Sequence, residues 1–164
     1  PPPSIHRPSV ASKDPQLAIV YYLYENGILY FATEKTSRKA KNILQNKKLA
    51  LLVVQEKELE LFQIEGYGEI ITDKEERIHI IQKIYDRLSK MDVHEPWPVM
   101  KLHPLNLEAF EIDIEWFKYS NFAENVVILE GKGSDLSKSP IEQDLSRDKS
   151  TPHQPRFFPH LRKR

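Results

Sequence analysis

The feature that most constrains the fold is a strand–turn–strand pattern near the beginning of the chain. Residues 16–24 (QLAIVYYLY) and 28–33 (ILYFAT) are rich in β-branched and aromatic residues, which favour extended strands. Glu25-Asn26-Gly27 separates them. Asn-Gly is a strong hairpin signal because both residues tolerate the positive φ angles of a tight turn. We therefore expect an antiparallel β-hairpin here.

Further strand patterns follow along the chain. Residues 49–54 (LALLVV) predict a buried strand, and residues 59–71 predict a long strand in which Gly66 and Gly68 indicate a bend or bulge. Residues 107–116 alternate between apolar and acidic side chains, which predicts a strand with Phe110, Ile112, Ile114 and Trp116 on one face. Residues 126–129 predict one more short strand.

Two helices are expected between these strands. Thr36 or Ser37 is placed to cap a short helix that ends near residue 46. Thr72 and Glu75 match a capping box, and apolar residues at helical spacing follow through residue 90. Five or six strands with two helices in 164 residues favour a β-barrel with helical accessories over an alternating βαβ fold.

The ends of the chain have a different composition from the middle. Residues 131–164 are rich in proline, serine and charge and end in RFFPHLRKR, so we expect a disordered, basic-tipped tail after a folded domain of residues 1–130. The first residue is a proline, and we expect that an N-terminal piece of the folded domain is missing.

Composition excludes several classes of site. The chain has no cysteine, so it has no disulfide, thiolate ligand or cysteine nucleophile, and a reducing cytoplasmic location is expected. The formal net charge is zero, which argues against a nucleic-acid-binding surface. No apolar run approaches the roughly 20 residues that span a membrane. The six histidines lack metal-ligand spacing, so no metal site is expected.

The candidate binding segment is the stretch Thr33–Lys39, which leaves a strand and enters a helix. Backbone N–H groups at a helix N-terminus favour an anion. Arg38 and Lys39 in the first helical turn are unfavourable beside the positive end of the helix dipole, unless an anion lies between these two side chains and the helix end. The residues alone are equally compatible with an ordinary capped helix that carries solvated lysines.

The same segment carries a family resemblance. Leu29-Tyr30-Phe31-Ala32-Thr33, then Ser37-Arg38-Lys39-Ala40 with Asn42-Ile43, and later Ile64-Glu65-Gly66 and Ile114-Glu115-Trp116, resemble the FMN-binding core of the pyridoxamine 5'-phosphate oxidase-like proteins, above all their short, general-stress-protein-like members. The resemblance covers about residues 8–122. It implies a mainly β fold, an antiparallel six-stranded split β-barrel of Greek-key type with two accessory helices.

The resemblance also implies a cofactor site at a homodimer interface. Arg38 and Lys39, with the Ser37 helix end, would bind the phosphate of FMN. Thr33 and the backbone around Ala32 would contact the cofactor at the end of their strand. The partner subunit's Trp116 would approach the flavin ring. The residues that would run along the ring are Ile19, Val20, Tyr21 and Tyr22.

Three functional hypotheses stay open at this stage. The first is an FMN-dependent oxidoreductase with an unidentified small-molecule substrate, and the second is a flavin-binding, stress-related protein without turnover. The third is a dimeric interaction module whose basic turn binds another anion. A deazaflavin in place of FMN is a variant of the flavin hypotheses. The true oxidases end in an Arg-x-His motif that grips the pyridoxal substrate, and the sequence after Trp116 has no such motif.

Overall fold

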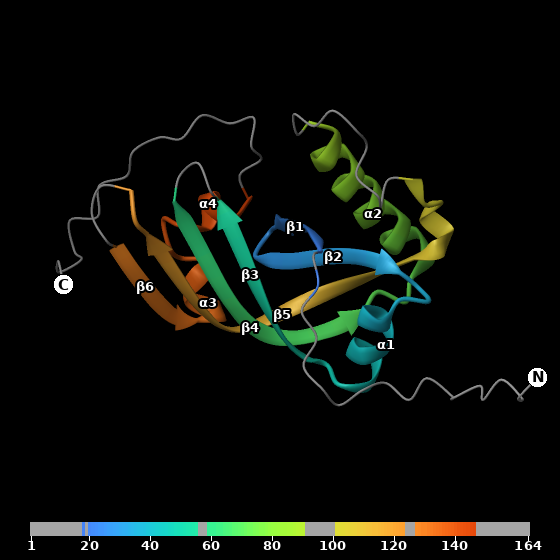
Figure 1. Ribbon diagram of the computed structural model, residues 1–164, viewed down its shortest axis with the longest axis horizontal. Helices are drawn as coiled ribbons and strands as arrows, with labels where there is room; N and C mark the ends of the chain where they lie inside the picture. The colour runs from blue at the N-terminus through green and yellow to red at the C-terminus, as the bar shows by residue number, and fades with distance from the viewer. Residues whose placement is uncertain (1–17, 19, 56–58, 91–100, 124–126, 147–164) are drawn as a thin grey trace, which may run out of the picture.

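The backbone is mainly β, as expected from the sequence. The structure, a computed structural model, describes residues 18, 20–55, 59–90, 101–123 and 127–146. Six antiparallel strands form one sheet in the order β1-β2-β5-β4-β3, with β6 paired to β5 (Figure 1). The strands are β1 (Tyr21–Glu25), β2 (Ile28–Glu34), β3 (Lys48–Gln55), β4 (Glu60–Ile70), β5 (Leu107–Asn121) and β6 (Val127–Lys132).

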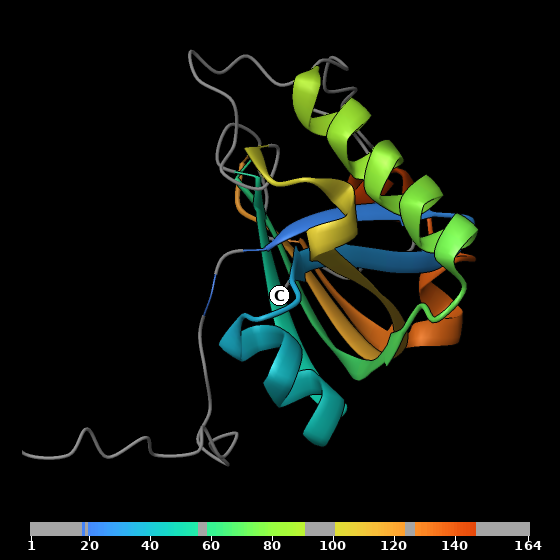
Figure 2. The same ribbon diagram turned by 90° about the vertical axis from the view of Figure 1, so that its right-hand side faces the viewer.

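The helices are attached to this sheet. They are α1 (Arg38–Gln45), α2 (Lys74–Ser89), α3 (Gly133–Leu136) and α4 (Glu142–Ser146), with a 3₁₀ turn η2 (Pro104–Asn106). Figure 2 shows α2 crossing obliquely over β1 and β2, while α1 lies away from α2. The helix α1 contacts β4 and β2. None of the helices in the described part of the chain is long and apolar enough to cross a bilayer.

The predicted hairpin is confirmed. Glu25 pairs with Ile28, and the two turn residues Asn26 and Gly27 have φ angles of 53° and 81°. These are the positive values that an Asn-Gly hairpin turn requires. Within the described residues, β1 pairs only with β2, β3 only with β4 and β6 only with β5, so each of these three strands has one open edge.

A β-bulge bends the sheet where Gly66 meets β5. The register shifts between Glu65 and Gly66, so that Gly66 pairs with Ile114 and Glu65 pairs with Trp116. A Cβ atom at Gly66 would lie 2.2 Å from the carbonyl oxygen of Asp113, so only glycine fits this close approach. The extra residue reverses the alternation, and the prediction that Trp116 shares a face with Ile112 and Ile114 is therefore wrong.

Two apolar cores lie on opposite faces of the sheet. The barrel interior contains buried residues of β1 to β5. Among them is a stacked pair, Phe31 and Phe110, with ring centroids 5.2 Å apart. The second core lies between α2 and the other face of β2 and β5. It contains Tyr30, Ala32, Ile80, Ile81, Ile84, Leu88, Leu107 and Ala109.

The two predicted helices are confirmed, with one change of cap. Ser37 caps α1, since its Oγ accepts a hydrogen bond from Ala40 N at 3.2 Å. The cap of α2 is Asp73, whose carboxylate accepts from Glu76 N at 2.8 Å, and not Thr72. The N-cap predicted from the sequence is therefore displaced by one residue, because Asp and Thr are both good caps and only the backbone decides between neighbours.

The prediction of a disordered tail is wrong for residues 131–146. β6 continues to Lys132, so a boundary at residue 130 would cut through a strand. The following segment contributes Leu136, Ile141 and Leu145 to the barrel core, each no more than 1% exposed. Two tyrosines of β1 hold α4 in place: Tyr22 Oη donates to Leu145 O and Tyr24 Oη to Glu142 Oε1, both at 3.1 Å. Residues 147–164 lie outside the described residues.

Candidate functional site

The turn between β2 and α1 brings together two of the predicted hydroxyl groups. Thr33 is buried, with 5% of its surface exposed, and its Oγ1 lies 3.1 Å from Ser37 Oγ. The backbone of the turn is fixed at both ends, because Ser37 N donates to Glu34 O and Lys35 N donates to Asn106 O, both at 3.0 Å. The turn is thus a rigid support for polar groups at the end of β2.

The N-terminus of α1 supplies donors to the same place. The first N–H groups of a helix have no intrahelical acceptor, and the helix dipole gives them positive character. The first turn of α1 contains no acidic residue. Arg38 is exposed there and Lys39 is partly buried. This helix end therefore presents donors and positive charge without a carboxylate of its own.

The cations near this turn differ in their partners. Lys35, Lys47 and Lys48 lie 3.7, 2.6 and 3.9 Å from carboxylates of Glu108, Glu69 and Glu115. Within the described residues, Arg38 has no ion pair. An available guanidinium beside two hydroxyls and a helix N-terminus is a donor set that suits a phosphate group. The residues present therefore fit the phosphate end of FMN.

The segment expected along the flavin ring is described in part. Ile19 lies outside the described residues. Tyr21 pairs with Ala32, so β1 runs directly beside β2, the strand that contains Thr33. Val20, Tyr21 and Tyr22 are all partly buried, and burial raises the pKa of Tyr21. The structure thus brings β1 next to Ala32 and Thr33, and it leaves the outer backbone edge of β1 without a strand partner among the described residues.

Trp116 is not brought to this turn within one chain. The partner of Thr33 across the β2–β5 pairing is Glu108, and Trp116 follows Glu108 by eight positions on β5. At about 3.3 Å per residue, this spacing amounts to roughly 26 Å along the strand. Trp116 lies instead between Glu65 on β4 and Lys132 on β6. It can meet the predicted phosphate site only if it comes from another subunit.

A pocket of about 510 Å³ lies at the opposite end of β2, and the sequence did not indicate it. Its lining includes Gly27 and Ile28 of the hairpin, Ser134 and Ser137 of the C-terminal segment, and the carboxylates of Glu69, Glu111 and Asp113. Acidic walls do not suit a phosphate. The pocket combines residues of β5 with Gly133, Ser134 and Ser137, which follow β6.

Metal ligation finds no support in the described part of the chain. No group of three or more His, Asp or Glu side chains there is arranged so that it could hold a metal ion. His103 uses Nδ1 to accept a hydrogen bond from Leu105 N at 3.2 Å. This contact fixes the beginning of η2.

Comparison with solved structures identifies the same fold elsewhere. A pyridoxamine 5'-phosphate oxidase-related, FMN-binding protein from Nostoc punctiforme is 18% identical, with 70% of each chain covered and a TM-score of 0.51. General stress protein 26 from Bacillus anthracis is 19% identical over 70% of this chain and 77% of its own, with a TM-score of 0.47. An F420 reductase is 18% identical over 58% and 72% of the two chains, with a TM-score of 0.45.

Comparison at the level of sequence gives the family. No curated protein matches the chain significantly. The sequence profile described as pyridoxamine 5'-phosphate oxidase matches residues 9–121, which is more than half of the chain and includes every strand from β1 to β5. The chain therefore belongs to the pyridoxamine 5'-phosphate oxidase family, whose split-barrel fold it shares.

Proposed function

We propose that this protein binds FMN and acts as an FMN-dependent oxidoreductase on a small molecule. The observation that carries the proposal is the turn between β2 and α1, where Thr33 Oγ1 and Ser37 Oγ lie 3.1 Å apart at a helix N-terminus. Arg38 stands beside them without an ion pair in the described residues. The family of the chain and the FMN-binding description of the Nostoc punctiforme relative agree with this proposal.

Each part of the site would have a separate task. Thr33, Ser37, Arg38 and Lys39 would bind the phosphate through charge-assisted hydrogen bonds. The backbone of β1 from Ile19 to Tyr22, together with Ala32, would lie along the ring. Bound FMN would supply the redox chemistry, and the protein would set the orientation, access and potential of the ring.

A homodimer would complete this site. Ala50, Leu52 and Val54 alternate with the interior residues of β3, and Leu52 and Val54 are 59% and 48% exposed. Trp116 lies on the same outer face, because Glu65 joins Ala50 on one side to Trp116 on the other. An exposed apolar face of this kind indicates an interface. A second copy that packs against this face would bring the partner subunit's Trp116 toward the flavin, which a single chain cannot do.

Two related functions are separated from this one by experiment. The first is a flavin-binding protein without turnover, and the second is a protein that binds a deazaflavin in place of FMN. Both would use the same turn, and flavin binding and turnover separate them. A cytoplasmic location, expected from the absence of cysteine, stays a prediction.

The test is a visible absorption spectrum of the protein after addition of FMN and removal of the excess. We expect a retained and perturbed flavin spectrum. We also expect Arg38→Ala with Lys39→Ala to weaken FMN binding by several kcal/mol, since charged hydrogen bonds contribute about 1.5–3 kcal/mol each. Riboflavin, which lacks the phosphate, serves as the matched ligand, and its affinity should not change in the double variant.

Each alternative has its own result. Retention of F420 but not FMN would favour the deazaflavin relative. Bound FMN that is not reduced by NADH or NADPH and does not reduce quinones or nitro compounds would favour the protein without turnover. A protein that binds no flavin, yet is folded, would contradict the proposal. Unchanged FMN affinity in the double variant would remove the phosphate role of Arg38 and Lys39.

A further inference from the structure

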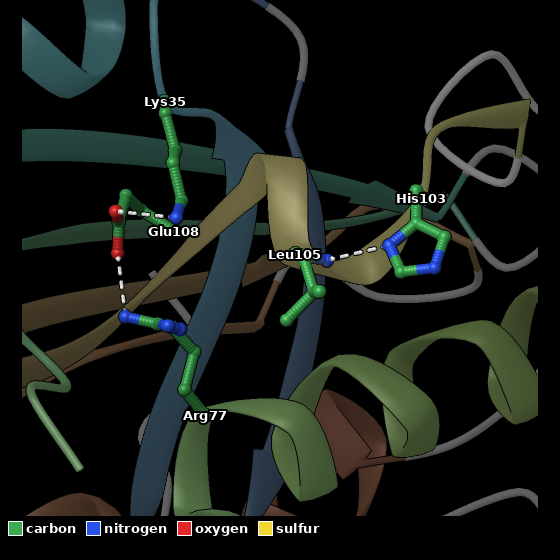
Figure 3. A network of polar contacts seen from close by, with 5 residues as sticks. All are labelled: Lys35, Arg77, His103, Leu105 and Glu108. Atoms are coloured by element: carbon green, nitrogen blue, oxygen red, sulfur yellow. Dashed lines mark hydrogen bonds and ion pairs between the residues drawn. The ribbon is translucent and has the colours of Figure 1, made fainter. Parts of the chain in front are cut away.

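A carboxylate lies next to the proposed phosphate site, held by two cations. Glu108 is the direct partner of Thr33 in the β2–β5 pairing, so the two side chains project from the same face of the sheet. The Glu108 side chain is 15% exposed. Arg77 of α2 donates from Nη1 to Glu108 Oε2 at 3.3 Å, and Lys35 Nζ lies 3.7 Å from Glu108 Oε1 (Figure 3).

The two cations are held unequally. The Arg77 side chain is 15% exposed and forms a hydrogen bond to the carboxylate, whereas Lys35 is 39% exposed and its contact is longer than a hydrogen bond. An ion pair that is exposed to this extent contributes little stability. Arg77 is therefore the fixed partner of Glu108, and the ammonium group of Lys35 is only loosely held there.

Lys35 is also well placed to change partners. Its backbone is fixed in the turn between Thr33 and Ser37, since Lys35 N donates to Asn106 O at 3.0 Å. Only rotations about side-chain bonds are needed to move its ammonium group from Glu108 toward the neighbouring hydroxyls. If Lys35 leaves, Glu108 keeps Arg77, so no partly buried carboxylate loses its only counter-ion.

We propose that Lys35 is an additional phosphate-binding residue, which rests on Glu108 in the absence of ligand and turns to the phosphate when FMN binds. The inference rests on the proposed function, because it assigns one more residue to the same cofactor site. A phosphate carries more charge than a carboxylate and offers three acceptor oxygens, so it competes well for a loosely held ammonium group. Lys35 would thereby contribute to the preference of the site for FMN over riboflavin.

The experiment measures dissociation constants for FMN and riboflavin by quenching of flavin fluorescence, in the wild type and three variants. Lys35→Gln should weaken FMN binding about tenfold and leave riboflavin binding unchanged. Lys138→Gln makes the same charge change at an exposed position in the C-terminal segment, and it should leave both constants unchanged. Glu108→Gln should not weaken FMN binding, because it removes the group that competes for Lys35. The melting temperature of each variant reports on folding.

The outcomes separate this inference from the function on which it rests. A wild type that binds neither flavin would refute the proposed function. A wild type that prefers FMN, with the same preference in Lys35→Gln, would overturn the role of Lys35 alone. If Glu108→Gln weakens FMN binding as much as Lys35→Gln does, the ion pair supports the turn and Lys35 does not bind the phosphate.

Discussion

The docked C-terminal segment gives the sharpest prediction about stability. Ile141 precedes α4 and is 0% exposed in the barrel core, where Leu136 and Leu145 are also buried. Replacing Ile141 with alanine removes three methyl or methylene groups from a site with no solvent contact. Substitutions of this kind cost about 2–5 kcal/mol, which includes the cavity that they leave.

The expected loss is a large share of the total stability. Small domains are stable by about 5–15 kcal/mol, and 1 kcal/mol corresponds to roughly 2–4 °C in melting temperature for a domain of this size. Ile141→Ala should therefore lower the melting temperature by about 5–15 °C. Leu145→Ala should act similarly. In the double variant, the melting temperature should fall by less than the sum of the two single effects. Both side chains dock the same short segment, and once that segment has undocked, a second substitution in it costs no further stability.

Urea unfolding followed by far-ultraviolet circular dichroism measures these changes. Lys138→Ala is the matched control, because Lys138 is exposed in the same segment, and it should change the free energy of unfolding by less than about 0.5 kcal/mol. If Ile141→Ala and Leu145→Ala were as mild as Lys138→Ala, the segment would not be part of the core and the disordered tail expected from composition would be restored.

Two further changes test local features of the fold. Asp73→Ala should lower the free energy of unfolding by about 1 kcal/mol through loss of the α2 cap, whereas Thr72→Ala should have little effect. Urea unfolding measures both changes. A larger loss in Thr72→Ala than in Asp73→Ala would show that Thr72 caps the helix, as the sequence predicts. Burial, and then the neighbouring Glu142, raise the pKa of Tyr24, so the folded state keeps the phenol protonated while the unfolded chain ionises near pH 10. The contribution of Tyr24 to the free energy of unfolding should be fully present below about pH 10 and be lost as the pH rises above it. Tyr24→Phe should make this fall in the free energy of unfolding smaller. An equal fall in the variant would show that Tyr24 is not its source.

The sequence by itself determined the local elements and one end of the site. Asn26-Gly27 required a hairpin turn, and Ser37 before a helical pattern required a helix end that follows Thr33 directly. These features depend on residues within one or two turns of each other, and their conformational preferences act before any distant contact forms. The proximity of Thr33, Ser37, Arg38 and Lys39 at this turn could therefore be expected from the chain alone.

The tertiary structure decided which distant residues meet. The bulge at Gly66 arises from the pairing of β4 with β5, and it alone places Trp116 on the outer face, away from Ile114. The C-terminal segment has too few apolar residues for a periodic pattern, yet Ile141 and Leu145 are buried because the end of the barrel offers them an apolar surface. Such outcomes depend on the shape of the rest of the molecule, and that shape is not encoded in the spacing of neighbouring residues.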